Sequence, residues 1–157
     1  MNIKLILCIF ATLLAVALAS PAANDKQTAC QRHRQRESSS STPNLPGKVI
    51  PNCDASGDYA PLQCHGETTK KGVKFCQCWT KSGDIISQPS TKIKTCSCLL
   101  DKDEKTKKKA TEIPACEASG HYKKAQCNAT SCRCVNPDTG ATVKSNIAKD
   151  KAETMCV

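Results

Sequence analysis

The side chains best suited to chemistry in this chain of 157 residues are thirteen cysteines and three histidines. Such residues can form a cysteine–histidine nucleophile pair, a zinc site or a framework of disulfides. Zinc sites usually contain Cys-x-x-Cys pairs. Here the close pairs are Cys-x-Cys, namely Cys76 with Cys78 and Cys132 with Cys134. We therefore expect disulfides, with no metal ion and no cofactor.

The first residues have the pattern of a secretory signal peptide. Lys4 precedes the apolar run LILCIFATLLAVALA, in which the small residues Ala17 and Ala19 suit signal cleavage. The run is about fifteen residues long, which is shorter than the roughly twenty that a membrane-spanning helix needs. We predict a signal peptide over residues 1–19, an N-terminal segment over residues 20–29, and a secreted, extracellular protein without membrane insertion.

Export decides what the cysteines can do. Removing the signal peptide removes Cys8 and leaves twelve cysteines, an even number, in a compartment where disulfides persist. A thiol nucleophile beside His33, His65 or His121 would need an unpaired cysteine, so we expect no enzymatic activity. Aromatic residues make up only 3% of the chain, so crosslinks must replace much of an apolar core.

One stretch of fourteen residues is written twice. PNCDASGDYAPLQC begins at Pro51, PACEASGHYKKAQC begins at Pro114, and eight of the fourteen positions are identical. The shared types are structural: a glycine for a turn with positive φ, a tyrosine to cover sulfur, and a glutamine to bind backbone groups. These are Gly57, Tyr59 and Gln63 in the first copy and Gly120, Tyr122 and Gln126 in the second. We predict that the repeat is scaffold and that function lies in the loops.

The twelve cysteines fall into two sets of six. We predict two consecutive modules, module 1 over residues 30–96 and module 2 over residues 98–156, with only Ser97 between them. Because the linker is so short, we expect the modules to have a restricted mutual orientation.

Each set has the order Cys, Pro-x-Cys, Gly-x-Tyr, Gln-Cys, Cys-x-Cys, Gly and a final Cys. This order resembles the thyroglobulin type-1 domain, twice over, across nearly the whole exported chain. The resemblance implies a small disulfide-rich fold, in which each module is a short N-terminal helix plus small antiparallel strands with three disulfides. Spacing alone leaves the pairing open, since six cysteines allow fifteen pairings. The resemblance implies pairing in sequence order: Cys30–Cys53, Cys64–Cys76, Cys78–Cys96, Cys98–Cys116, Cys127–Cys132 and Cys134–Cys156.

The chain departs from the family pattern in two respects. The centres of its Cys-x-Cys pairs are Gln77 and Arg133 where the family usually has tryptophan, and a tryptophan follows one step later at Trp79. The middle loop of module 1 has eleven residues, HGETTKKGVKF, whereas that of module 2 has only four, NATS. Module 2 has therefore lost most of one loop.

Regular structure is expected to be short. CQRHRQRES, from Cys30, favours a short helix that ends at the loop-like stretch SSSSTPNLPG. DYAPLQC, VKFCQCWT, HYKKAQC and SCRCVN have the pattern of short antiparallel strands, with KSGD and NPDTG as turns. We expect no helix long enough to organise a domain, and we interpret the charged run KDEKTKKKA as a loop between cysteines.

Family members called thyropins inhibit papain-like cysteine proteases with three loops that form a wedge and fill the active-site cleft. The resemblance places these loops of module 1 in residues 38–50, in residues 65–74 and after Trp79 up to Ile86. Loops pinned by disulfides have little entropy to lose on binding. We predict an inhibitor of cathepsin L-like proteases that acts mainly through module 1. The expected contact residues are Ser38, Pro46, Gly47, His65, Gly66, Gly72, Lys81 and Gly83.

The basic charge allows more than one interpretation. The net charge is +9, or +8 once Lys4 leaves with the signal peptide. This charge favours encounter with acidic lysosomal proteases, but it equally suits solubility alone. Weak polyanion binding is a further candidate, although a charged run is more often simply solvated. The residues concerned are Lys105, Lys107, Lys108 and Lys109. We expect no nucleic-acid partner.

The short loop of module 2 contains the N-glycosylation sequon NAT at Asn128. Because this loop is short, we predict that module 2 inhibits weakly, not at all, or a different class of protease. Two other functions remain open. One is a venom or saliva component acting on an ion channel or host receptor, and the other is a module that docks a growth factor or matrix partner.

Overall fold

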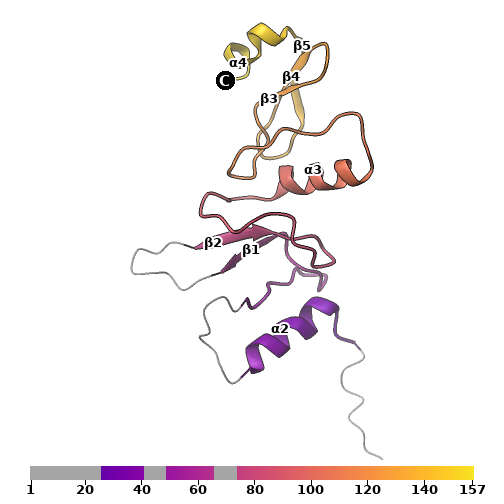
Figure 1. Cartoon of the computed structure of the whole chain (residues 1–157), viewed down its shortest axis with the longest axis vertical. Helices are drawn as coiled ribbons and strands as arrows, with labels where there is room; N and C mark the ends of the chain where they lie inside the picture. Colours follow the sequence, from indigo (N-terminus) through magenta and orange to yellow (C-terminus); the bar gives the residue numbers. More distant parts are fainter. Residues whose placement is uncertain (1–25, 41–48, 66–73) are drawn as a thin grey trace, which may run out of the picture.

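The two modules follow one another along the longest axis of the molecule (Figure 1). The structure is a computed structural model, and it describes residues 26–40, 49–65 and 74–157. The predicted signal peptide lies outside the described residues. Of the helices in the described part, none is long and apolar enough to cross a membrane.

Module 1 begins with helix α2, Ala29–Ser39, which confirms the helix predicted from Cys30. Thr28 caps the N-terminus: its hydroxyl accepts from the Gln31 N–H, and the Gln31 side chain accepts from the Thr28 N–H. This reciprocal pair satisfies two N–H groups that have no partner within the helix. Cys30 is the buried residue of α2, so a disulfide rather than an apolar face attaches the helix to the module.

Strands β1, Leu62–His65, and β2, Phe75–Cys78, form an antiparallel pair. Cys64 lies directly opposite Cys76, and their disulfide joins Cα atoms that are 4.0 Å apart. The disulfide and the strand pairing therefore enforce the same register. Both strands are shorter than the stretches predicted from the sequence.

Module 2 contains helix α3, Ser97–Lys107, and a three-stranded antiparallel sheet in the order β3, β4, β5. Strand β5 was not predicted, because five of its six residues are exposed and no alternation of apolar and polar side chains marks it. The remaining elements are β3 Ala125–Cys127, β4 Cys132–Val135, β5 Thr142–Ile147, the 3-10 turn η1 Lys149–Lys151 and helix α4 Ala152–Met155.

Most of the charged run, interpreted above as a loop, lies on helix α3, so that interpretation is wrong. The physical reason is a ladder of ion pairs, each with an acidic residue one turn before a lysine, which is the favourable order on a helix. The pairs are Asp101–Lys105 at 3.0 Å, Asp103–Lys107 at 2.7 Å and Glu104–Lys108 at 2.6 Å. The helix then ends at Lys107, and Lys109 has a positive φ of 52°.

Six disulfides, three in each module, form the centre of the fold. Each of the four buried apolar clusters contains at least one disulfide cysteine. The low aromatic content is thus offset by sulfur, and the fold is the small disulfide-rich one predicted. The bonds join the partners that the resemblance implies: Cys30–Cys53, Cys64–Cys76, Cys78–Cys96, Cys98–Cys116, Cys127–Cys132 and Cys134–Cys156.

The repeated glutamines are internal struts for the backbone. Gln63 is fully buried, and its Oε1 accepts from the Asn52 N–H at 2.8 Å. Its Nε2 donates to the carbonyls of Asn52 and Ala60 at 2.7 and 2.8 Å. Gln126 makes the same three bonds in module 2. The predicted role of these glutamines as partners of backbone groups is confirmed.

The repeated glycines form turns that bind the start of the first helix of each module. Gly57 and Gly120 both have a φ of +87°, as predicted. In module 1, the Thr28 hydroxyl donates to the Gly57 carbonyl. In module 2, the Cys98 N–H donates to the Gly120 carbonyl at 3.2 Å. The two turns therefore accept a hydrogen bond at equivalent positions in the two modules.

The segment around Thr28 contacts module 1. The last residues of module 1 contact module 2 at the equivalent position. The N–H groups of Lys94 and Thr95 donate to the Ser119 carbonyl at 2.8 and 3.1 Å. From the other side, Leu99 and Leu100 of α3 pack against the buried cluster of module 1 around Cys78. Backbone bonds and apolar packing thus both join the modules, in agreement with the restricted orientation expected from the short linker.

Candidate functional site

Three segments of module 1 meet at Trp79, which is 6% exposed. Val49, from the first segment, packs against the buried cluster that contains Trp79. The ring of His65, from the second, lies with its centroid 6.3 Å from that of Trp79. Ile85, from the third, forms an antiparallel β-bridge with Trp79. The structure therefore brings together the ends of the three segments that the resemblance assigns to a wedge.

Large apolar side chains project from these same segments. Ile50 is 43% exposed, Phe75 is 48% exposed and Ile85 is 57% exposed. Phe75 lies opposite His65 in the β1–β2 pair, so it stands at the end of the middle segment. These three side chains are carried by, or lie next to, the segments that converge on Trp79, which makes them the candidate contact residues of this region. We call Ile50, Phe75 and Ile85 the apolar edge.

Trp79 is supported from behind by the rings of Tyr59 and His33, with centroids 5.6 and 6.5 Å away. The Tyr59 hydroxyl lies 3.1 Å from His33 Nδ1, and His33 Nε2 lies 4.0 Å from a carboxylate oxygen of Glu37. Helix α2 therefore braces the tryptophan through one hydrogen-bonded ring pair. These contacts hold the ring of Trp79, on which the three segments converge, in a single orientation.

His65 is an uncharged member of this surface. Burial lowers its pKa, because burial disfavours the charged imidazolium. Its Nε2 and the indole Nε1 of Trp79 are buried, and neither has a hydrogen-bond partner among the residues that the structure describes. At neutral pH, His65 therefore presents an uncharged ring rather than a cation.

The predicted contact residues have unequal roles. Lys81 is exposed in the turn after Trp79, and its carbonyl accepts from the Tyr59 N–H at 3.3 Å. Gly83 has a φ of +97°, and a Cβ atom there would lie 2.8 Å from the Tyr59 ring, so its role is structural. Pro46, Gly47, Gly66 and Gly72 lie outside the described residues.

The first predicted loop begins at Ser38, but in the structure Ser38 does not begin a loop. It lies within α2, and its hydroxyl donates to the Arg34 carbonyl one turn earlier at 2.7 Å. A serine can bond back in this way without ending a helix. The first segment therefore starts later than predicted.

Sequence reasoning did not name the apolar edge as contact residues. Ile50 and Ile85 fall inside the predicted segments and Phe75 follows the middle one, but the contact residues predicted there are mostly glycine, proline and charged residues. A usable signal existed: each is a large apolar residue next to turn-forming or polar residues in a chain with few apolar aromatics.

Module 2 has a different edge. Val135 replaces Trp79 and packs with Cys98 and Tyr122. Its middle loop is a closed turn in which the Asn128 N–H donates to the Ser131 carbonyl at 2.9 Å. Asn128 Oδ1 also accepts from the Thr130 N–H at 2.9 Å and from the Thr130 hydroxyl at 3.1 Å. Module 2 thus has neither the aromatic centre nor a projecting middle loop.

Asn128 is exposed at the start of this turn. Nearby, Arg133 and Glu112 form an ion pair at 2.7 Å. Hydrogen bonds from Arg133, and then from Asn128, lower the pKa of the Glu112 carboxyl. Glycosylation of Asn128 stays a prediction, and a glycan there would cover the turn.

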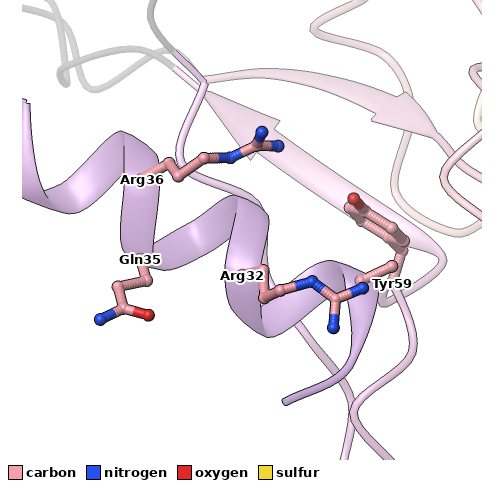
Figure 2. A pocket seen from close by; sticks show the side chains of 5 residues that line it. Arg32, Gln35, Arg36 and Tyr59 are labelled. Carbon is pink, nitrogen blue, oxygen red and sulfur yellow. The ribbon is translucent and has the colours of Figure 1, made fainter. Parts of the chain in front are cut away.

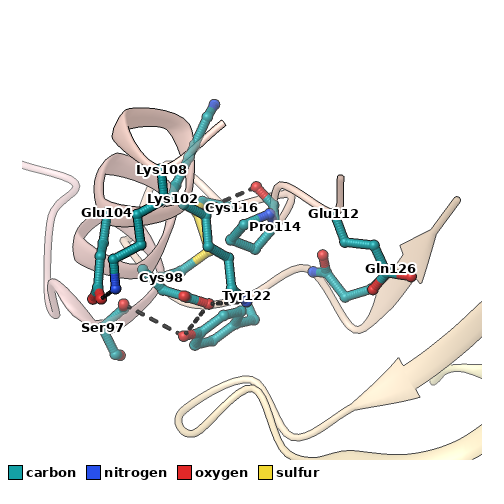
Figure 3. A network of polar contacts seen from close by, with 12 residues as sticks. Ser97, Cys98, Lys102, Glu104, Lys108, Glu112, Pro114, Cys116, Tyr122 and Gln126 are labelled. Atoms are coloured by element: carbon teal, nitrogen blue, oxygen red, sulfur yellow. Dashed lines mark hydrogen bonds and ion pairs between the residues drawn. A yellow bond between two sulfur atoms is a disulfide. The ribbon is translucent and has the colours of Figure 1, made fainter. Parts of the chain in front are cut away.

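Tyr122 anchors helix α3 to module 2 (Figure 3). Its hydroxyl donates to Asp101 Oδ2 at 3.1 Å and lies 3.5 Å from the Ser97 carbonyl. Burial, followed by the negative charge of Asp101, raises the pKa of Tyr122 to about 12. Both effects disfavour the tyrosinate.

We expect the raised pKa of Tyr122 to make stability depend on pH in strong alkali. Since the folded pKa is raised, its contribution is complete below the unfolded pKa of about 10. It is lost as the pH rises to about 12. The chain has two tyrosines, so ultraviolet titration of a Tyr59→Phe variant isolates Tyr122. Asp101→Asn should lower this pKa, and ordinary titration of Tyr122 near pH 10 would contradict the contact.

No group of three or more histidine, cysteine, aspartate or glutamate side chains is placed to hold a metal ion within residues 26–40, 49–65 and 74–157. The twelve cysteines of the described part are all in disulfides.

Comparison with known proteins identifies the family. The profile of the thyroglobulin type-1 repeat matches residues 30–98 and again residues 99–156. The chain is 38% identical over 127 residues to U20-hexatoxin-Hi1a of Hadronyche infensa, covering 78% of this chain and 83% of that protein. It is 37% identical over 99 residues to U24-ctenitoxin-Pn1a of Phoneutria nigriventer, covering 62% and 71%. Against human thyroglobulin it is 26% identical over 117 residues, covering 62% of this chain and 4% of that protein. The chain therefore belongs to the thyroglobulin type-1 repeat family, with two repeats in tandem.

Proposed function

We propose that this protein is a secreted inhibitor of papain-like cysteine proteases and that the apolar edge of module 1 blocks the active-site cleft. The observation that carries the proposal is the convergence of three segments on Trp79, with Ile50 and Ile85 exposed on two of these segments and Phe75 exposed next to the third. Three projecting segments fixed to one buried residue have the shape that a cleft can accept.

The third segment is already ordered before any partner binds. The Thr80 N–H donates to the Asp84 carbonyl at 2.9 Å, and the Ile86 N–H donates to the Cys78 carbonyl at 2.9 Å. The Asp84 carboxylate accepts from the hydroxyls of Ser82 and Thr80, which lowers its pKa. A turn fixed in this way loses little conformational freedom on binding, which favours affinity.

The middle segment is tied at its base. The Cys64–Cys76 disulfide joins the two strands that carry it. His65 and Phe75, the next residue pair of the two strands, present an uncharged ring and an exposed phenyl group. Such a base suits the apolar walls of a substrate cleft, where a charged group would have to lose its water.

A pair of matched substitutions in the full chain tests the proposal. Ile85→Asp places a charge on the apolar edge, and Val143→Asp places the same charge on an exposed valine of module 2, which is 73% exposed. We expect Ile85→Asp to weaken inhibition of papain and cathepsin L by about tenfold or more, since buried interface anchors dominate binding. Val143→Asp should change it by less than about twofold. Inhibition is measured by titrating each protease with oxidised protein.

The fold of each variant is checked first, by Trp79 fluorescence and by the mass of the fully oxidised chain. Equal loss of inhibition in both variants would contradict the assignment to module 1. Absence of inhibition by the unsubstituted protein across a panel of cysteine proteases would overturn the proposed function itself.

The names of the two similar proteins call them toxins, which favours a second candidate, a venom component. We take an ion channel or a host receptor as its target. The same variants separate the candidates. Channel block that survives Ile85→Asp, in a sample without protease inhibition, would support the second candidate. Protease inhibition that is lost in Ile85→Asp would support the first.

A further inference from the structure

We propose that helix α2 carries a binding site for a sulfated polysaccharide, formed by Arg32 and Arg36 beside Tyr59. An open cavity of about 400 Å³ lies along this part of the helix. The two arginine side chains extend from α2 towards the side on which Tyr59 lies (Figure 2). The cavity is lined by Ala29, Arg32, Gln35, Arg36 and Tyr59.

The charge of these arginines is not neutralised by the described part of the chain. Neither Arg32 nor Arg36 forms an ion pair with a carboxylate of a described residue. Glu37, the acidic residue of α2, lies beside His33 instead. One Nη atom of Arg32 donates to the Gln27 carbonyl, which orients the guanidinium group and leaves its other donors for a ligand.

The donor set fits sulfate groups on a sugar chain. Arg32 and Arg36 lie one helical turn apart, so both guanidinium groups face one side of α2. A guanidinium group matches the oxygens of a sulfate in a two-point contact, which an ammonium group cannot make. Gln35 adds an amide that both donates and accepts, as a sugar hydroxyl requires. Sulfate and hydroxyl groups occur together on sulfated polysaccharides.

Helix α3 offers a comparison within the same chain. It carries three lysines where α2 carries three arginines. However, Lys105, Lys107 and the C-cap residue Lys108 are each paired with a carboxylate one turn earlier. A polyanion would have to compete with these carboxylates for each lysine. The structure therefore assigns polyanion binding to α2 rather than to the lysine run that the sequence analysis considered.

The test measures binding of a defined heparin fragment to the full oxidised chain at several salt concentrations. We expect Arg32→Gln/Arg36→Gln to weaken binding about tenfold or more, because two charge-assisted contacts are lost. The slope of log affinity against log salt should fall by about two, one for each counterion no longer released. Lys107→Gln/Lys108→Gln removes the same charge from α3 and should weaken binding by less than about twofold.

Glutamine and arginine have similar helix propensities, so α2 should remain folded, which circular dichroism checks. Equal weakening in both double variants would overturn the site, because it would mean that net charge alone binds heparin. Failure of the unsubstituted chain to bind heparin at physiological salt would also overturn it.

Two competitors distinguish the source of the anion. Inorganic sulfate at the same sulfate concentration should compete poorly with heparin, and polyglutamate of matched charge should bind more weakly. Equal binding of polyglutamate would replace the polysaccharide by an acidic protein and so overturn the proposal. Full displacement of heparin by inorganic sulfate at matched concentration would reduce the site to one for free sulfate and would overturn it as well.

Discussion

Gly120→Ala is expected to lower the free energy of unfolding of the oxidised protein by about 3 kcal/mol or more. Gly120 has a φ of +87°, which costs a residue with a side chain roughly 1–2 kcal/mol. The added Cβ atom would lie 1.7 Å from the Thr95 carbonyl oxygen. That oxygen belongs to the backbone of module 1, so it can move only if the junction opens.

Gly57→Ala is the matched control. Gly57 has the same φ of +87°, but its added Cβ atom would meet the Thr28 side chain, with Cγ2 at 2.5 Å. The Thr28 side chain can rotate away but then gives up its cap on α2. This variant should therefore lose the backbone term of roughly 1–2 kcal/mol and about 1 kcal/mol for the cap, without opening the junction. Denaturant unfolding followed by circular dichroism compares the two. Equal losses would show that the junction between the modules is not tight.

Gln63→Ala has the second large expected effect, a loss of about 3–5 kcal/mol of stability. The side chain is fully buried and bonds the Asn52 N–H, the Asn52 carbonyl and the Ala60 carbonyl. Truncation leaves three backbone groups without these partners in a buried region and creates a cavity. Module 1 contains Trp79, the single tryptophan of the chain, so its fluorescence reports the unfolding.

Gln77→Ala supplies the control for this prediction. Gln77 lies opposite Gln63 in the β1–β2 pair, is half-buried, and makes no side-chain hydrogen bond to a described residue. Its truncation should cost less than about 1 kcal/mol. A loss of stability for Gln63→Ala that is no larger than that for Gln77→Ala would contradict a stabilising role of the Gln63 hydrogen bonds.

Much of the framework could be predicted because the sequence repeats it in both modules. Two copies of the stretch around Gly57 and Gly120 showed which residues are scaffold, and the structure gives each pair the same φ and the same bonds. Helix α3 could not be predicted in this way. Its counterpart α2 has a different charge pattern, and the ion pairs from Asp101 to Lys108 become visible only once helical spacing is assumed.

The candidate site was predictable as segments but not as side chains. Loop positions follow from the cysteine order, whereas the convergence on Trp79 depends on distances between residues that are far apart in sequence. The tryptophan stood one position from its usual place, and the sequence alone indicated only that it packs. Its burial among Val49, Tyr59 and His65 is a property of the folded module.

Binding of the full chain to papain with a filled or an open cleft tests the central claim most directly. In one sample the active-site cysteine carries a small carboxamidomethyl group, and in the other it carries a peptidyl group that fills the substrate cleft. The wedge needs space rather than a reactive thiol, so we predict tight binding to the first sample. Binding to the second should be weaker by about a hundredfold or more. Equal binding to both samples, or binding to neither, would contradict occlusion of the cleft by the apolar edge.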